Sequence, residues 1–287
     1  MNYIRILHSL PEFRSQRIIL SRVKTGGTNI KYFVFTKKGN YVARFLGAQQ
    51  ERFLQLNRPR EIYNTKLAYK KGIGPKVIAY YPQYGLLILE YIKGRVLRKY
   101  NLRRRSCLSK IVKILRALHS GLPFEGKFDV LASIEYYLRI IKSDGKKMPL
   151  LNSASWQKYE LAKKTIKERK FRLSPCHIDL MHLNFIENNG KLKMIDWEYS
   201  AMSDPLFDLA FLSAQGRLRA RDDVYLLNKY FGKIDAKLMC EFKAMKTLFY
   251  LREGLWSLVQ LGRSDLPFDY QSYTKKNFKW FNQFNLD

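Results

Sequence analysis

The sequence predicts an α+β protein with two lobes, a small β-rich lobe with one main helix and a larger, mostly helical lobe. Three observations support this prediction. Short apolar runs separated by turn residues fill residues 1–91, which is typical of strands. Apolar residues then recur at helical spacing to the end of the chain. With 287 residues and 46% hydrophobic side chains, the chain has enough apolar material to build a core for two lobes.

The β-rich lobe is expected over residues 1–91. A strand at residues 17–24 leads into a turn at 25–29, and strands at 30–36 and 41–46 form a hairpin around residues 38–40. A helix is expected from about residue 59 to residue 71, because Gly72 is a C-cap signal and Pro75 follows it. Strands at 76–81 and 85–91 complete the lobe.

A connector at residues 92–102 should lead into the helical lobe, residues 103–287. The periodicity predicts helices over residues 106–119, 130–142, 155–169, 221–231, 236–261 and 270–284. Between them, residues 176–208 are expected to form a loop, a short hairpin and a second loop. Strands at 183–187 and 191–195 would flank the hairpin turn at 188–190.

The composition is strongly basic, with 53 Lys and Arg against 24 Asp and Glu and a formal net charge of +29. Such a field favours polyanions, which include nucleic acid, anionic membrane and ATP. The alternative is that surface lysines accumulated without a specific partner. The basic residues are spread along the chain and no nucleic-acid-binding motif accompanies them. The densest cluster, residues 95–105, could make peripheral contact with an anionic surface.

Cysteine usage and hydropathy favour the cytoplasm. The three cysteines are scattered and odd in number, so they form no disulfide framework or metal-binding spacing. No apolar run approaches the roughly 18–20 residues that span a bilayer. The first residues, which include Arg5 and His8, do not resemble a signal peptide. A cytoplasmic protein is therefore expected.

The most informative stretch places His177, Asp179, Asn184 and Asp196 in order over twenty residues. This order suits phosphoryl transfer, in which one carboxylate receives the proton of an attacking hydroxyl while an amide and a second carboxylate hold Mg²⁺. Each residue also has an ordinary structural interpretation, since Asp179 and Asp196 could be turn residues and Asn184 a cap at the start of a strand. The complete set in this order favours a catalytic site.

Three motifs in this region resemble the choline kinase branch of the aminoglycoside phosphotransferase and protein-kinase-like superfamily. The chain reads HIDLMHLN over residues 177–184, IDWEYS over 195–200 and DPLFDLA over 204–210. The resemblance implies a bilobal protein-kinase-like fold that uses ATP and Mg²⁺. It also implies Asp179 as catalytic base within the His177 motif, and Asn184 and Asp196 as metal ligands. Asp208 would brace the catalytic loop.

The resemblance extends to the β-rich lobe. Gly26, Gly27, Thr28 and Asn29 stand where this family has its phosphate loop, and glycines there would let backbone N–H groups approach phosphate oxygens. Arg44 stands where most kinase-like enzymes have a phosphate-binding lysine, and choline kinases resemble this chain in having arginine. It would grip phosphate through two nitrogens, although an exposed strand arginine is the alternative.

Two further nucleotide-site assignments follow from the same resemblance. Glu61, on the predicted helix, would form an ion pair with Arg44, although a glutamate on a helix surface is also common. The run through Glu90 and Ile92 resembles the connector that binds adenine through backbone groups.

The acceptor site should lie in the helical lobe. A quaternary ammonium has no hydrogen-bond donor, so proteins hold it with aromatic faces and a carboxylate. The segment EGLWSLVQ resembles a choline kinase pocket helix, and the predicted substrate-binding residues are Glu198, Tyr199, Glu253, Trp256 and Tyr270. Core packing on an apolar helix is the alternative for Trp256, since 14% of the residues are aromatic. Two positions depart from the family pattern. Glu253 stands where eukaryotic choline kinases have a second tryptophan, and Met181 replaces a polar residue.

These features predict a small-molecule kinase that phosphorylates the hydroxyl of choline, an amino-alcohol. Thiamine, ethanolamine and, less favoured because of the +29 charge, an aminoglycoside are the alternative acceptors. The alternative from another class is an inactive kinase-like fold that binds nucleic acid or an anionic membrane. The presence of Asp179, Asn184 and Asp196 argues against it.

Overall fold

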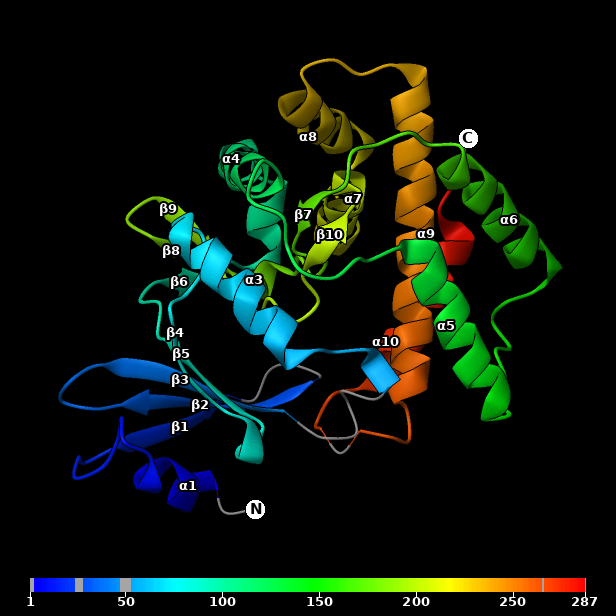
Figure 1. The fold of residues 1–287 in the computed structure, drawn as a ribbon. Coiled ribbons are helices and arrows are strands. Elements are labelled where there is room, and N and C mark those ends of the chain that lie inside the picture. The colour runs from blue at the N-terminus through cyan, green and yellow to red at the C-terminus, as the bar shows by residue number, and fades with distance from the viewer. Residues whose placement is uncertain (1–2, 24–27, 47–52, 265, 287) are drawn as a thin grey trace.

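The computed structural model describes residues 3–23, 28–46, 53–264 and 266–286. It is an α+β structure in which an antiparallel sheet lies on one side and a group of helices on the other, as Figure 1 shows. The predicted fold class is therefore confirmed.

The N-terminal sheet has five described strands in the order β1-β2-β3-β5-β4, and all neighbouring strands are antiparallel. Their bounds are close to those predicted: β1 Ile19–Val23, β2 Asn29–Phe35, β3 Asn40–Leu46, β4 Val77–Tyr81 and β5 Leu86–Glu90. Helix α1, Tyr3–Ser9, was not predicted and packs on one face through Leu7. Ala43 and Phe45 belong to the core under that helix, whereas Arg44 points to the other face, as strand alternation requires.

Helix α3, Arg58–Lys70, is the main helix of this lobe. The Asn57 side chain caps its first turn by accepting the Arg60 N–H at 2.8 Å, and Pro59 lies in that first turn. Gly72 adopts φ 74° just beyond its end, so the C-terminal signal in the sequence was correct. A short 3₁₀ turn, η1 Pro82–Tyr84, joins β4 to β5.

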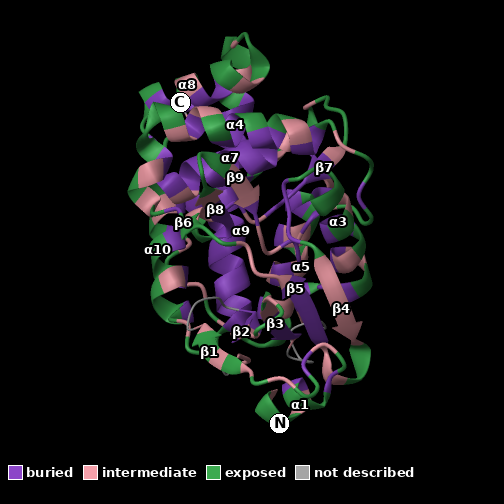
Figure 2. Cartoon of the chain, turned by 90° about the vertical axis from the view of Figure 1, so that its left-hand side faces the viewer, coloured by how far each residue is buried: buried purple, intermediate pink, exposed green. Residues whose placement is uncertain are grey.

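The connector contains β6, Arg95–Val96, and the 3₁₀ helix η2, Lys99–Arg103. Six predicted helices follow within about two residues of their expected bounds: α4 Arg105–His119, α5 Val130–Ser143, α6 Ser153–Lys167, α8 Ala220–Phe231, α9 Ala236–Gln260 and α10 Tyr270–Gln283. Helix α9 lies at the centre, buried on all sides over its second half and packed against α5, α6 and α10 (Figure 2). In the described part of the chain, no helix is long and apolar enough to cross a membrane.

The segment of residues 174–216 is more structured than predicted. It runs β7 Ser174–Cys176, η3 His182–Asn184, β8 Phe185–Asn188, β9 Lys191–Met194, β10 Ala201–Ser203 and α7 Pro205–Gly216. The hairpin β8–β9 is confirmed, but Asn184 ends a 3₁₀ turn rather than starting a strand. The expected loop around Asp208 was wrong, because Asp204 caps helix α7 and accepts the Leu206 N–H at 2.9 Å.

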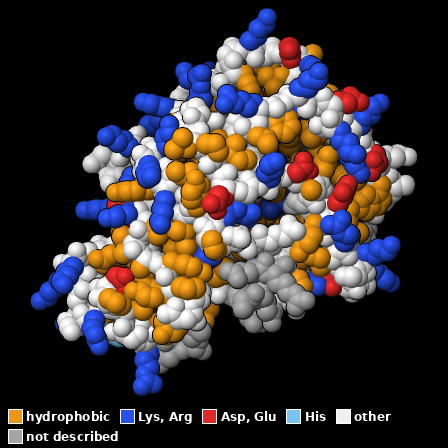
Figure 3. Space-filling model, in the orientation of Figure 1, with side chains coloured by type: hydrophobic (Ala, Val, Ile, Leu, Met, Phe, Trp, Pro, Cys, Tyr) orange, Lys and Arg blue, Asp and Glu red, His pale blue; other side chains and the backbone are white. Residues whose placement is uncertain are grey.

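Lys and Arg side chains are scattered over the surface shown in Figure 3 rather than gathered on one element. The three cysteines are free, in agreement with the absence of a disulfide pattern. Neither feature marks a binding surface on its own.

Candidate active site

A cavity of about 500 Å³ opens between the sheet and the helical lobe. Four parts of the chain line it: the open face of the sheet, the connector, the segment around Asp179 and Asp196, and helix α9 with the start of α10. Most of the predicted site residues are among its lining side chains. These are Thr28, Arg44, Glu90, Ile92, Asp179, Asn184, Asp196, Glu198, Tyr199, Glu253 and Trp256.

Asp179 lies on the loop after β7 and faces this cavity. Asn184 holds it from five residues away, since its Nδ2 donates to both the Asp179 carbonyl and Oδ2 at 2.9 Å. Burial raises the pKa of Asp179 well above its ordinary value, and the nearby charges of Asp196, Glu253 and Glu198 raise it further. A carboxylate in such surroundings is a stronger proton acceptor than one in water.

Asp208 fixes the backbone of this loop by hydrogen bonds from its side chain. Its two carboxylate oxygens accept the N–H groups of His177 and Ile178, each at 2.8 Å. Ile178 has φ 69°, a conformation that β-branched residues rarely adopt, so these hydrogen bonds hold a strained backbone in place. The predicted bracing role of Asp208 agrees with these contacts, and His119 Nε2 at 3.1 Å supports the same carboxylate.

His177, predicted as a catalytic residue, is fully buried and does not line the cavity. Its Nε2 donates to the Ile195 carbonyl at 3.0 Å, and its ring packs on Trp197 with centroids 4.6 Å apart. Burial lowers its pKa, which favours the neutral ring. The imidazole therefore links the Asp179 loop to the residue before Asp196, and its ring lies away from the cavity.

Asp196 follows β9. The Ile195 N–H donates to the Asn184 carbonyl at 3.0 Å, and this backbone hydrogen bond brings Asp196 close to Asn184. Its side chain is flanked by two cations: Lys31 Nζ is 2.7 Å from Oδ2, and Arg44 Nη2 is 2.8 Å from Oδ1. Burial by itself would raise the pKa of Asp196, but the charges of Arg44 and Lys31 outweigh it and hold the pKa below the ordinary value. Asp196 is therefore an anion at neutral pH.

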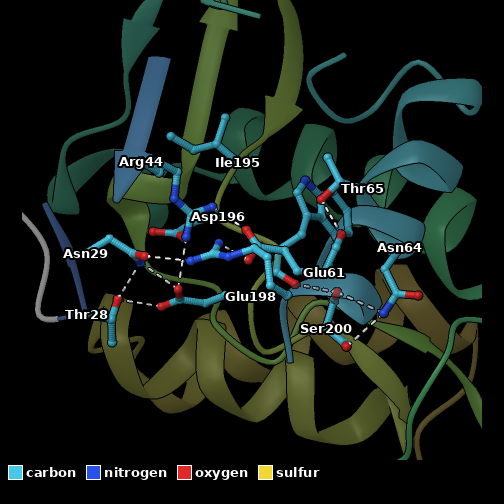
Figure 4. A network of polar contacts seen from close by, with 12 residues as sticks. Thr28, Asn29, Arg44, Glu61, Asn64, Thr65, Ile195, Asp196, Glu198 and Ser200 are labelled. Carbon is cyan, nitrogen blue, oxygen red and sulfur yellow. Dashed lines mark hydrogen bonds and ion pairs between the residues drawn. The ribbon is translucent and has the colours of Figure 1, made fainter. Parts of the chain in front are cut away.

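Arg44 is the centre of a buried polar network, shown in Figure 4. It forms ion pairs with Glu61, Asp196 and, at 2.9 Å, Glu198, so the predicted Arg44–Glu61 pair is confirmed. Arg58 is a second cation on Glu61. With Lys31, the network holds equal numbers of cations and carboxylates, which satisfies the requirement that buried charges be paired.

Glu198 was predicted to bind substrate, and the structure gives it different contacts. Its carboxylate accepts hydrogen bonds from Thr28 Oγ1 at 2.5 Å and Asn29 Nδ2 at 2.6 Å, in addition to the Arg44 contact. Glu198 is therefore engaged in tying the start of β2 to the helical lobe. Of the predicted phosphate loop, Thr28 lines the cavity and Asn29 lies behind it, whereas Gly26 and Gly27 lie outside the described residues.

Aromatic side chains form the wall of the cavity next to α9. Trp256 Nε1 donates to the Tyr199 hydroxyl at 2.9 Å, and the rings of Phe268 and Tyr273 each lie 6.1 Å from the Trp256 ring, centroid to centroid. Tyr270 also packs beside Trp256, at 6.0 Å, but it is not among the lining residues. Tyr273, one turn further along α10, lines the cavity, whereas the substrate contact expected of Tyr270 stays a prediction.

Glu253, the position that departs from the family pattern, is buried and held by two partners. It forms an ion pair with Arg252 and accepts a hydrogen bond from the Tyr273 hydroxyl at 2.7 Å. Arg252 in turn lies 5.3 Å from the centroid of the Tyr199 ring. The carboxylate thus replaces an aromatic ring at this position without leaving an unpaired charge.

The charge of the cavity wall differs from that of the whole protein. Its described lining residues include three cations, Lys31, Arg44 and Arg252, and five carboxylates, Glu90, Asp179, Asp196, Glu198 and Glu253. The cavity lining therefore holds more acidic than basic side chains, within a chain of formal charge +29. The lining also includes residues that were not predicted from the sequence, among them Lys31, Arg252, Phe268 and Tyr273. Of these four, only Arg252 had a local signal, because it lies one helical turn before Trp256 on α9.

A β-rich lobe, a helical lobe and a carboxylate-lined cavity between them are the architecture of kinase-like phosphotransferases. The sequence profile of the choline/ethanolamine kinase family matches residues 20–215. The chain belongs to this family and is an ATP-dependent kinase that phosphorylates an alcohol.

Individual relatives agree with this assignment. The protein LicA of Haemophilus influenzae is 29% identical over 215 residues, which cover 71% of this chain and 78% of LicA. A choline/ethanolamine kinase family protein from Mesorhizobium loti has a similar structure, with a TM-score of 0.79, 26% identity and coverage of 97% and 92% of the two chains. The structure of the choline kinase LicA from Streptococcus pneumoniae is also similar, with a TM-score of 0.77 and 26% identity, and the match covers 92% of this chain and 94% of LicA.

Proposed function

We propose that this protein transfers the γ-phosphoryl group of ATP to the hydroxyl of choline and releases phosphocholine. The observation that supports this most directly is the cavity of about 500 Å³ between the sheet and the helical lobe. Connector residues 90–92, Asp179 with Asp196, and the aromatic wall around Trp256 all line it. One continuous space therefore offers surfaces for a nucleotide, for the transfer step and for a small acceptor.

The acceptor end favours a cation without N–H groups. Tyr199, Trp256, Phe268 and Tyr273 present aromatic rings, which attract an organic cation through the negative charge of their faces. Glu253, the carboxylate beside these rings, is already engaged by Arg252 and Tyr273, so it is less available to accept from an ammonium N–H. The local excess of carboxylates adds a long-range attraction for a positive acceptor.

Asp179 is proposed to receive the proton of the choline hydroxyl as that oxygen attacks phosphorus. The raised pKa that burial imposes on it suits this task. In reactions of this class most of the catalysis comes from positioning and charge neutralisation. The loop around Asp179 is positioned by two side chains, since Asp208 accepts the N–H groups of His177 and Ile178, and His177 Nδ1 accepts the Asp179 N–H at 3.4 Å.

Arg44 and the backbone of residues 90–92 are proposed to bind ATP, and Asn184 and Asp196 to hold Mg²⁺. The donor set fits such an ion, because both residues offer hard oxygens and Asp196 Oδ1, besides its ion pair with Arg44, has no hydrogen-bond partner among the described residues. When bound, the ion would neutralise charge on the phosphates. The buried Nε of Arg44 also lacks a partner in the described part of the chain, which leaves it one free donor.

The test is a steady-state assay of the purified protein with ATP and Mg²⁺ and, separately, choline, ethanolamine, thiamine or an aminoglycoside as acceptor. Choline should give the highest kcat/KM. Turnover of another acceptor without choline turnover would contradict the acceptor assignment and leave the kinase assignment intact. The Asp179→Ala variant should lose at least about 10²–10⁴-fold in kcat while its ATP affinity stays nearly unchanged.

A further inference from the structure

Lys31 is a cavity-lining cation that the assignments above leave without a role in the reaction. It lies on β2 directly opposite Arg44 of β3, so both side chains leave the sheet on the cavity side. Each of them neutralises one oxygen of Asp196, Lys31 at 2.7 Å from Oδ2 and Arg44 at 2.8 Å from Oδ1. The carboxylate assigned to the metal is thus paired with two protein cations.

The two cations are held very differently. Arg44 is 3% exposed and is fixed by Glu61 and Glu198 in addition to Asp196, so moving it would break several buried ion pairs. The Lys31 side chain is 16% exposed, and among the described residues its ammonium pairs with Asp196 alone. A lysine is also a point charge on a flexible stem, whereas arginine is planar and directional. Lys31 is therefore the cation that can leave Asp196 at low cost.

We propose that Lys31 is a movable counterion, which pairs with Asp196 as long as no nucleotide is bound and turns to the phosphate chain of ATP when the nucleotide binds. This inference rests on the proposed ATP and Mg²⁺ sites and adds a residue to them. Each charge stays paired throughout, because Asp196 exchanges an ammonium for a metal ion while Lys31 exchanges a carboxylate for phosphate oxygens. This continuous pairing is needed because an unpaired buried charge would raise the free energy of the folded protein.

Calorimetric titration with ATP, ADP and AMP, without any acceptor, tests the phosphate contact. The Lys31→Gln variant should bind ATP and ADP roughly 10- to 100-fold more weakly, the value of one charge-assisted hydrogen bond, and AMP within about twofold of wild type. Lys31→Arg, which keeps the charge, should retain most of the ATP affinity. Lys38→Gln is the matched control. Lys38 is exposed at the turn of the same hairpin, and its replacement also removes one positive charge.

Titration with Mn²⁺ alone, followed by electron paramagnetic resonance, tests the counterion role. Lys31→Gln should bind Mn²⁺ more tightly than wild type, because Asp196 has lost a competing cation, whereas Lys38→Gln should not. Equal weakening of ATP and AMP, unchanged ATP affinity, or unchanged Mn²⁺ affinity would each overturn the proposal.

These outcomes are separable from a failure of the proposed function. ATP binding that depends on Lys31, in a protein that does not phosphorylate choline, would contradict the acceptor assignment alone. Choline phosphorylation with ATP affinity independent of Lys31 would contradict this inference alone.

Discussion

Replacement of Glu198 by alanine is the sharpest test of the buried network. The Glu198 carboxylate is 3% exposed and accepts three hydrogen bonds, from Thr28 at 2.5 Å, Asn29 at 2.6 Å and Arg44 at 2.9 Å. In Figure 4 these contacts join the start of β2 to the segment that carries Asp196. Removal of the carboxylate leaves buried donors without acceptors and gives the network an excess positive charge.

The size of the effect follows from these contacts. Truncating one partner of a buried ion pair costs about 3–5 kcal/mol, because the remaining charge stays buried. For domains of about 150–250 residues each kcal/mol corresponds to about 2–4 °C in Tm, so Glu198→Ala should lower Tm by roughly 6–20 °C. The Tm of Glu198→Gln should lie between those of the wild type and the alanine variant, since the amide keeps one acceptor oxygen but carries no charge.

Glu187→Ala is the matched control, because Glu187 also pairs with two cations, Arg95 at 3.1 Å and Lys110 at 2.7 Å. Those partners are 74% and 43% exposed, so each pair should contribute only about 0–1 kcal/mol. Urea denaturation and thermal unfolding measure both variants. If the unfolding free energy of Glu198→Ala lies within about 1 kcal/mol of that of Glu187→Ala, the pairing argument for the buried network is wrong.

Two further predictions concern the acceptor wall and the basic surface. Trp256→Ala should raise the choline KM about 2- to 30-fold, which is the range of one cation–π contact. Trp280→Ala should leave the choline KM unchanged, because Trp280 is not part of the cavity lining. Equal choline KM values for the two variants in steady-state kinetics would show that Trp256 only packs in the core. Burial, followed by the charges of Arg217, Lys276 and Arg103, lowers the pKa of Lys99 from 10.5 to about 8. The unfolded chain therefore binds more protons between these values, and stability should rise with pH across that window. Lys99→Gln should accordingly raise Tm near pH 7 in low salt, with a smaller gain near pH 10, and a lower Tm near pH 7 would contradict the assignment.

The sequence predicted the elements whose boundaries are marked by local chemistry. Helix α3 has a capping asparagine at its start and Gly72 at its end, and both act through residues no more than a few positions away. The hairpin β8–β9 has Asn189 and Gly190 in its turn, both with positive φ. Helix α7 was missed because it is buried on nearly all sides, so its apolar residues show no amphipathic period.

Within the site, the sequence indicated residue types better than side-chain directions. The motif around Asp179 placed a histidine and two carboxylates in one region, but it did not show that the His177 ring points into the core. Likewise, the role of Glu198 depends on Thr28 and Asn29, which lie about 170 positions earlier in the chain. Contacts over such separations are decided by the packing of the two lobes, which a single sequence does not display.

The net charge of the protein likewise did not predict the charge of the residues that line the cavity. The formal charge of +29 argued against an acidic site for a cationic acceptor, because a net charge describes the field far from the surface. Inside a cavity the nearest groups dominate, since exposed charges beyond about 10 Å are screened by salt. Folding brings five carboxylates and three cations to the cavity wall, and the basic residues that produce the net charge remain scattered outside. A basic protein can therefore hold a cation, because the lining residues rather than the composition set the potential that the acceptor meets.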